Sequence, residues 1–364
     1  MANPYTKPLH VVRKRMVRWV ERSLLPAVDR ESASQLIHYE NRQKDWGAAL
    51  PDLPGHILEV YQTWRDDPDE SWVRLYKGPA TLDPVAGLVF VQGKVVWGST
   101  DARPRVRERS PKWQAHWGGN HRRFDAVISL RSIFESNYFH YLNDVLPKLR
   151  LIEQLGLPES IPVVVSNRLA TCRFFADTVR LGFFGGRQVI VQGAREAIAA
   201  KEVYVPSDFD CDRAAYDWLC DRLGAGRHSS KGDAIYVHRG ASSPNRRGYR
   251  NEAEVFRLMA RHSVRVIDPA EHTLAEQVDL FSGAGLVIGP HGAGLANLLF
   301  RRGPGNLIEL FNPNIGTPHY YLIARLRGLG YRWRYNLNPQ GKENVASSEM
   351  DVVAVEAALK ELMG

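Results

Sequence analysis

The clearest hydrophobic pattern lies in the second half of the chain, where short apolar runs alternate with amphipathic stretches. Most runs are rich in valine, isoleucine and leucine and have the length of a strand. Two of the stretches between them begin with helix-capping sequences, at Asn251 and Thr273. Such alternation predicts a parallel sheet covered on both faces. The predicted strands are residues 234–238, 264–267, 286–289, 307–311 and 331–335.

The pattern of the first half is less regular. A hairpin is predicted around Gln92-Gly93. Residues 31–80 show little periodicity, and four prolines there favour loops and short helices. The other predicted strands are residues 124–130, 161–166, 188–191 and 202–205. The predicted helices are residues 137–155 with a kink at Pro147, 169–181 and 212–223.

A glycine- and serine-rich segment, residues 224–232, separates these two halves and is the best candidate for a domain boundary. Apolar positions near the start of the chain recur at helical spacing among arginines, which predicts a basic amphipathic helix. A last helix is predicted at residues 348–362. The predicted units are a basic N-terminal helix (1–30), an N-terminal domain (31–225), a C-terminal domain (226–345) and a C-terminal helix (346–364).

Composition narrows the class of protein. With 364 residues, 44% of them hydrophobic and 24% charged, the chain reads as a globular α/β protein of two domains. Three cysteines are too few for a disulfide framework and favour a reducing compartment. Residues 1–30 and 101–123 each carry a net charge of +5, and the remainder is near neutral. These basic stretches suit a membrane surface or a phosphorylated substrate better than nucleic acid.

The apolar segments do not predict secretion or membrane insertion. Arginines interrupt the first apolar stretch, which therefore lacks a signal-peptide core. The longest segment without Lys, Arg, Asp or Glu, residues 280–300, contains five glycines and Pro290, which disfavour a helix. We expect a cytoplasmic protein. The basic helix, at residues 9–25, either docks weakly on anionic lipid at the inner face of the membrane or packs against the body with its arginines solvated.

The most informative segment is residues 286–300, which reads as an apolar strand, a glycine-rich turn and a helix. Backbone N–H groups and the positive end of the helix dipole can hold a phosphate at such a turn. Gly292 and Gly294 would let the phosphate approach the backbone, and His291 could add a donor. The third glycine of the dinucleotide fingerprint is absent. We predict phosphate or nucleotide contact; the alternative is a turn that serves only helix–strand packing.

Arginines and one carboxylate extend this predicted site. Arg239 follows a strand, at the end where α/β proteins bind ligands. Arg246 and Arg247 lie in the next loop, and a guanidinium matches phosphate oxygens, although a solvated basic loop is the alternative. Glu309 falls inside a predicted buried strand, where a carboxylate needs a partner. That partner is predicted to be ribose; the alternative is an internal arginine.

A polar stripe on the predicted helix 137–155 supplies candidate catalytic groups. His140 and Asp144 stand four residues apart, so the carboxylate can orient the imidazole, or either group can accept a proton. The alternative is a solvated helix face. Asp208 and Asp210 follow a strand and could hold Mg²⁺ or Mn²⁺ against a diphosphate. The same residues suit a helix N-cap and first turn, and we predict no metal site.

Together these segments resemble glycosyltransferase family 61, including its bacterial polysaccharide-biosynthesis members. The resemblance covers roughly residues 124–312 and implies a GT-B architecture, in which two Rossmann-like domains face a cleft. The second domain would hold the nucleotide-sugar, and residues 31–225 would form the acceptor side. The matching segments, in order, are residues 137–149, 236–239, 246–252 and 276–297, followed by Glu309.

The resemblance and the residues lead to one hypothesis: inverting transfer of a hexose or pentose from a nucleotide-sugar, such as a UDP-sugar, to a hydroxyl of a glycan or lipid-linked acceptor. No cofactor and no nucleic acid are expected. The pyrophosphate would lie at Gly292, Ala293 and Gly294, with Asn297 in the same segment, and the three arginines and His291 would stabilise its charge. His140 or Asp144 would be the base. The alternatives are a metal-dependent transferase using Asp208 and Asp210, and a non-catalytic nucleotide- or glycan-binding subunit of a membrane-docked assembly complex.

Overall fold

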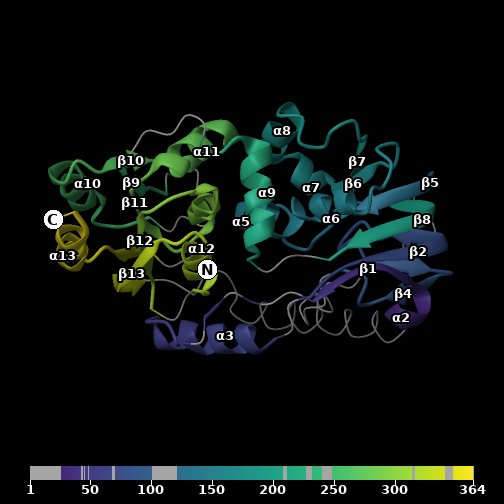
Figure 1. Ribbon diagram of the computed structural model, residues 1–364, viewed down its shortest axis with the longest axis horizontal. Helices are drawn as coiled ribbons and strands as arrows, with labels where there is room; N and C mark the ends of the chain where they lie inside the picture. The colour runs from purple at the N-terminus through teal and green to yellow at the C-terminus, as the bar shows by residue number, and fades with distance from the viewer. Residues whose placement is uncertain are drawn as a thin grey trace, which may run out of the picture.

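The computed structural model describes residues 26–41, 44, 46–47, 49–67, 70–100, 121–207, 211–226, 232–239, 248–313, 316–340 and 347–363. Within these ranges the fold is mixed α/β, with one large sheet in each half of the molecule (Figure 1). The predicted basic helix at residues 9–25, the Arg246–Arg247 loop and the pair Asp208 and Asp210 lie outside the described residues.

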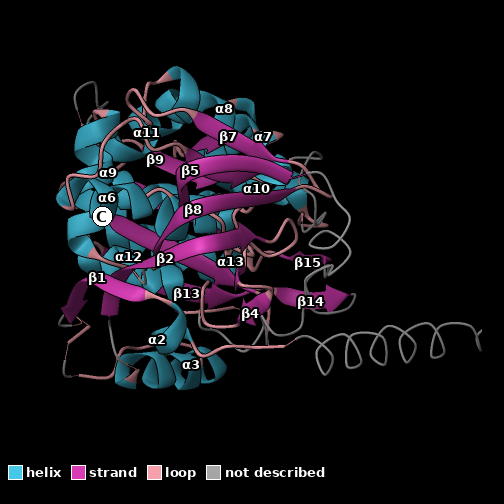
Figure 2. Ribbon diagram, turned by 90° about the vertical axis from the view of Figure 1, so that its right-hand side faces the viewer, coloured by secondary structure: helices cyan, strands magenta, loops and turns pink. Residues whose placement is uncertain are grey.

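The first sheet has eight strands in the order β4-β3-β2-β8-β5-β6-β7, with β1 also paired to β2. Its twist is visible in Figure 2, where β2, β8 and β5 succeed one another. The predicted hairpin and the four predicted strands of this half are confirmed. The antiparallel strands are β1(Gln35–Asn41), β2(Glu70–Leu82), β3(Val89–Val91) and β4(Lys94–Val96). The parallel strands are β5(His121–Ser129), β6(Val163–Ser166), β7(Val189–Gln192) and β8(Ala197–Pro206), which also runs antiparallel to β2.

The prediction of loops and short helices for residues 31–80 is wrong. This region contains β1, the thirteen-residue strand β2 and the twelve-residue helix α3(Gly55–Asp66). Pro79 hides the strand in the sequence, but it lies where the register between β2 and β8 shifts, so its missing N–H is tolerated. Pairing with neighbouring strands, rather than local periodicity, makes β2 a strand.

Most helices of the first half follow β5 in the chain. The predicted helix 137–155 is divided into α5(Tyr138–His140), a π-type turn η2(Tyr141–Val145) and α6(Lys148–Gln154). The break falls at Pro147, which cannot donate a helical hydrogen bond. The remaining helices are α2(Arg30–Ala33), α7(Asn167–Ala170), α8(Arg173–Arg180) and α9(Arg213–Leu223). Gly224 ends α9 in the left-handed conformation, as helix C-termini often require.

The second sheet is entirely parallel and confirms all five predicted strands. They are β9(Ala234–Val237), β10(Arg265–Ile267), β11(Leu286–Pro290), β12(Asn306–Phe311) and β13(Gly330–Tyr335). Their order in the sheet is β10-β9-β11-β12-β13, so the direction of strand addition reverses between β9 and β11. In open α/β sheets such a switch point, at the carboxyl ends of the strands, is where ligands bind.

Helices and a small hairpin complete the second half. The predicted capping box at Thr273 is present at the start of α11. The predicted helix start at Ser348 is wrong, because residues 347–349 form a strand and the helix begins at Val352. The helical elements are α10(Glu252–Arg261), η3(Pro269–Glu271), α11(Leu274–Gly283), η4(Ala293–Phe300), α12(His319–Leu326) and α13(Val352–Met363), and the hairpin is β14(Leu337–Gln340) with β15(Ser347–Glu349).

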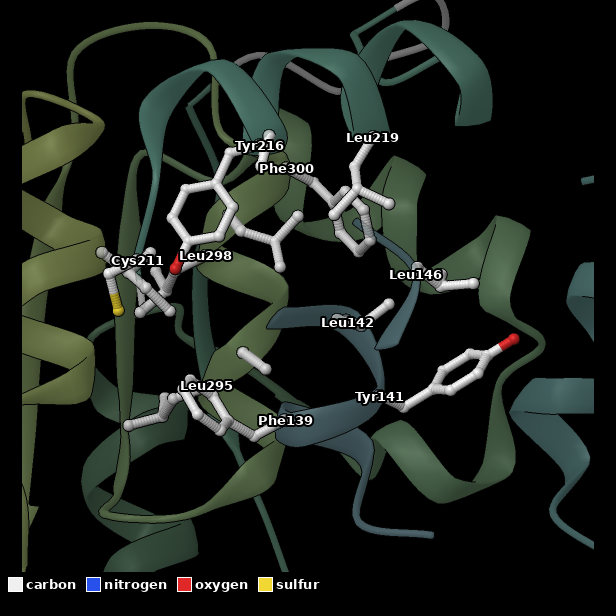
Figure 3. Packing of buried hydrophobic residues seen from close by; sticks show 14 of the residues in the cluster. Phe139, Tyr141, Leu142, Leu146, Cys211, Tyr216, Leu219, Leu295, Leu298 and Phe300 are labelled. Carbon is white, nitrogen blue, oxygen red and sulfur yellow. The ribbon is translucent and has the colours of Figure 1, made fainter. Parts of the chain in front are cut away.

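One hydrophobic core joins the two halves. Figure 3 shows side chains of η2, α9 and η4 packed together, including Leu142, Tyr216 and Leu298. The helix α3, which belongs to the first half in sequence, also packs on the second half. Its Tyr61 lies edge-on to Tyr321 of α12 at 5.7 Å between ring centroids. This packing brings α5 beside η4 and thereby positions the site.

Candidate active site

The carboxyl ends of β9 and β11 place two predicted site residues together at the switch point. Arg239 follows β9 by two residues, and His291 directly follows β11. The guanidinium of Arg239 donates a hydrogen bond to the backbone carbonyl of His291. The two residues are distant in sequence, and parallel pairing of β9 with β11 makes them neighbours.

A pocket lies at this edge of the second sheet. The empty space there, open solvent included, amounts to about 290 Å³. Its lining combines a cation and an imidazole with amides and hydroxyls, a mixture that suits a polar, anionic ligand. The lining residues are Arg239, Tyr249, Pro290, His291, Leu310, Asn312, Asn336 and Ser348.

Arg239 is the main positive charge of this pocket. Its side chain is half-buried, and no carboxylate among the described residues lies within ion-pair distance of it. Burial lowers the pKa of the Arg239 guanidinium from its usual value, because the charged form loses solvation. A partly desolvated cation is stabilised by an anion. The pocket therefore offers a binding position for a negatively charged group.

The glycines of the turn have different roles. A Cβ at Gly292 would collide with the guanidinium of Arg239, so this glycine makes room for the arginine. A Cβ at Gly289 would lie 3.0 Å from Leu295 and Val237, and one at Gly294 would lie 3.0 Å from Val237. Gly289 and Gly294 therefore permit close packing of η4 on the sheet, and Gly292 shapes the pocket.

His291 is held by a buried acid. Its Nδ1 lies 2.6 Å from Oε1 of Glu309, and its ring stacks on Phe311 with a centroid separation of 5.2 Å. The hydroxyl of Tyr331 donates to Oε2 of Glu309 at 2.8 Å. Burial, followed by the charge of Glu309, raises the pKa of Tyr331, so its hydroxyl keeps its proton and remains a donor. These contacts fix the imidazole and leave Nε2 without a partner among the described residues.

The contacts of Glu309 differ from both roles considered in the sequence. Its side chain is fully buried, and its two oxygens are already bound by His291 and Tyr331. A ribose hydroxyl has no access to a fully buried carboxylate in this arrangement, and no arginine pairs with Glu309 within the described ranges. The carboxylate acts on the pocket through His291.

A second histidine–carboxylate pair lies on α5 and η2. Nδ1 of His140 lies 2.6 Å from Oδ2 of Asp144. The other oxygen of Asp144 accepts a hydrogen bond from the amide of Asn143, whose own oxygen accepts one from Tyr216 on α9. Asp144 is buried, whereas His140 is half-buried and its Nε2 has no partner in the described part of the chain. This geometry makes Asp144 the orienting group and His140 the group that can exchange a proton.

Aromatic rings connect the two pairs. Tyr320 of α12 lies edge-on to His291 at 5.1 Å and edge-on to Phe139 at 5.7 Å between ring centroids. Phe139 precedes His140, and the two rings are 5.2 Å apart. The pair His140 and Asp144 is thus linked to His291 through two intervening rings, those of Phe139 and Tyr320.

Other predicted site residues have structural contacts instead. Asn297 is fully buried; its amide donates to Gln277 and its oxygen accepts from the hydroxyl of Tyr138. It therefore joins α5, α11 and η4 and does not reach the pocket. Ala293 is half-buried at the start of η4. Arg246 and Arg247 lie outside the described residues.

Several pocket and site residues were not singled out in the sequence, among them Tyr249, Asn312, Tyr331, Asn336 and Ser348. A signal was available for the two asparagines, because each directly follows a parallel strand. Asn312 follows β12 and Asn336 follows β13. Arg239 was predicted as a site residue for the same reason, since ligands of α/β proteins bind at the carboxyl ends of strands. No comparable signal marks Tyr331, whose role depends on its lying near Glu309 on the neighbouring strand β13.

The described residues contain no group of three or more His, Cys, Asp or Glu side chains arranged to hold a metal ion. Asp208 and Asp210, the predicted alternative, are outside these residues and are not tested by this observation. Among the described helices, none has the length and apolar content needed to cross a membrane.

Fold and site define an α/β protein with a ligand pocket at the switch point of a parallel sheet and a histidine–aspartate pair beside it. Residues 138–308 match the family described as Glycosyltransferase 61, which confirms the resemblance drawn from the sequence. This part of the chain is thus similar to glycosyltransferase family 61, and the family implies glycosyltransferase activity. The matched region contains His140, Asp144, Arg239 and His291 and ends just before Glu309. No curated protein matches the chain.

Proposed function

We propose that the protein is an inverting glycosyltransferase that moves a sugar from a nucleotide-sugar donor to a hydroxyl of a glycan or lipid-linked acceptor. The observation that carries the proposal is the half-buried guanidinium of Arg239, without a carboxylate partner in the described ranges, beside His291 at the switch point. A diphosphate is the anionic part of such a donor, and its oxygens match a guanidinium.

In this proposal the donor is a UDP-sugar whose diphosphate contacts Arg239, the free Nε2 of His291 and the turn at Gly292. Negative charge grows on the diphosphate as the glycosidic bond breaks, and fixed donors aimed at that charge lower the barrier. Through its contact with Nδ1, the buried carboxylate of Glu309 would hold the imidazole of His291 so that Nε2 is presented to the diphosphate. The nucleoside would extend toward the amides of Asn312 and Asn336 in the same pocket.

The acceptor hydroxyl is activated by the second histidine–carboxylate pair. His140, oriented by Asp144, takes the proton of the acceptor hydroxyl on Nε2. The acceptor oxygen then forms a bond to the anomeric carbon while the bond from that carbon to the diphosphate oxygen breaks. Attack opposite the leaving group inverts the configuration. The positive charge that forms on His140 is stabilised by the buried carboxylate of Asp144.

Two substitutions test this division of roles. Arg239→Ala should weaken UDP binding by about tenfold or more, since a charge-assisted hydrogen bond contributes on the order of 1.5–3 kcal/mol. Asp144→Asn should abolish transfer and leave UDP binding largely intact. Calorimetric titration with UDP and a transfer assay against a panel of nucleotide-sugars measure the two effects. Equal loss of binding in both variants would contradict the assignment.

We also propose an architecture, a pathway and a location for this glycosyltransferase. A GT-B arrangement would have the two sheets on opposite sides of the donor, and the reaction would serve the synthesis of a polysaccharide or cell-surface glycan. The basic residues 9–25 would hold the enzyme peripherally at the inner face of the membrane, near a lipid-linked acceptor. Whether the anomeric configuration inverts can be read from proton NMR coupling constants of the product.

A further inference from the structure

We propose that three rings, those of Trp64, His319 and Phe134, form an acceptor-sugar subsite around His140, and that the acceptor hydroxyl belongs to a sugar whose apolar face stacks on Trp64. The inference rests on the proposed function, because it takes His140 as the base. It adds the class of acceptor, a carbohydrate ring, and the residues that recognise it.

The rings form a continuous row. His140 stacks on Phe134 with centroids 4.9 Å apart and an interplanar angle of 26°. On another side it lies edge-on to His319 at 6.3 Å, and His319 lies 4.8 Å from Trp64. All four side chains are half-buried, so each keeps part of its surface accessible. A hydroxyl within reach of Nε2 of His140 must therefore belong to a group that lies against this row.

Trp64 is held rigidly although it comes from a segment far away in sequence. On α3 the neighbouring Tyr61 is fully buried, stacks on Trp46 at 5.5 Å and donates a hydrogen bond to the carbonyl of Trp46. The carbonyl of Trp64 accepts a hydrogen bond from Lys44. The edge-on contact of Tyr61 with Tyr321 fixes the helix on the second half. Trp64, one turn from the buried Tyr61, thereby lies beside His319.

The chemistry of the row suits a sugar. A pyranose or furanose ring has a face of C–H groups that packs on a flat aromatic ring, and hydroxyls at its edge that need polar partners. Trp64 supplies the flat ring, and the row also contains two imidazoles, of which His319 is positioned by a hydrogen bond with Thr317 at 2.6 Å. Large, rigid aromatic side chains with a polar edge give contact area at little cost in conformational entropy.

Three of the four rings lie outside residues 138–308, the region matched by the family. Trp64 and Phe134 precede it and His319 follows it. The base therefore lies within the family region, and the surface that would select the acceptor is added by this chain's own flanking segments. The subsite is in that sense a property of this protein and not of the match.

Saturation-transfer NMR with methyl glycosides of common hexoses and pentoses tests the subsite without knowledge of the natural acceptor. At least one glycoside should bind the wild-type chain through its C–H face, and the signal should be lost in Trp64→Ala and retained in Trp64→Phe. The matched control is Trp218→Ala, which removes another half-buried helical tryptophan, one that packs against Phe183 and Arg222. Thermal melting of each variant confirms that it is folded.

Kinetics separates this inference from the proposed function. With the best glycoside as acceptor, Trp64→Ala should raise the acceptor KM about tenfold, equivalent to ~1.4 kcal/mol, while UDP binding stays unchanged. If Trp64→Ala leaves the acceptor KM unchanged while sugar is still transferred, the subsite is overturned and the proposed function stands.

The subsite is also overturned if no glycoside binds to the wild-type chain, or if binding needs an isoprenyl phosphate and not a sugar. Loss of UDP binding and transfer in the wild-type chain would instead refute the proposed function.

Discussion

At the scale of single residues, the site consists of two imidazoles that are each oriented by a buried carboxylate. Asp144 holds His140 and Glu309 holds His291, both at 2.6 Å through Nδ1. In the proposed mechanism their tasks differ, since His140 accepts a proton and His291 donates a hydrogen bond to the leaving group. The difference in surroundings supports this division, because His291 lies next to Arg239 at the pocket and His140 lies among aromatic rings.

Glu309→Gln tests whether Glu309 acts through His291. The amide keeps the size of the side chain but removes the carboxylate that holds Nδ1 of His291, so kcat should fall about tenfold or more, given ~1.5–3 kcal/mol for a charge-assisted hydrogen bond. The donor KM should change little. Steady-state kinetics measures both constants. A rise in donor KM at constant kcat would instead favour direct contact with ribose, and Tyr331→Phe, which keeps the charge, should have a smaller effect.

At the scale of elements, the strand–turn–helix unit from β11 to η4 provides the geometry of the pocket. The turn passes so close to Arg239 that Gly292 has no room for a Cβ. Its φ of 164° is extended and open to any residue, so the requirement for glycine is one of space and not of backbone strain. The π-type turn η2 has a corresponding role in the first half, since it joins His140 to Asp144.

Gly292→Ala should therefore displace the guanidinium of Arg239 and lower UDP affinity about as far as Arg239→Ala does. The expected loss is roughly tenfold or more, equal to the contact that Arg239 would make. Gly55→Ala is the matched control, because a Cβ there has no heavy atom within 4 Å. Calorimetric titration with UDP compares the three variants. Full affinity in Gly292→Ala would show that the arginine does not bind the ligand.

At the scale of the whole molecule, the two halves share one hydrophobic core. A single apolar core runs from Trp46 and α5 through α9 to η4 and α12. Figure 3 shows the part of it formed by α5, η2, α9 and η4. Polar contacts cross the same boundary, including the hydrogen bond from Tyr138 to Asn297 and that from the backbone of Leu274 to Asp177. The mutual orientation of the two histidine pairs depends on this interface.

A fragment of residues 226–364 should fail to fold by itself. It would expose the faces of η4 and α12 that α5, α9 and α3 cover, and each fully buried large apolar side chain contributes about 1.5–3 kcal/mol. Near-ultraviolet circular dichroism and calorimetry should show no cooperative transition for the fragment and a clear one for the full chain. A fragment with native-like thermal unfolding would show that the second half is an independent domain.

The sequence by itself determined the features that depend on local spacing. Periodicity located the five strands of the second sheet, the glycine turn and the end of α9, and an interval of four residues paired His140 with Asp144. Tertiary structure decided the features that depend on distant partners: the strand β2, the contacts of Glu309 with His291 and Tyr331, and the position of Trp64 beside His319. A local pattern records which face of an element is apolar, whereas the identity of a buried side chain's partner depends on how sheets and helices pack across long stretches of chain.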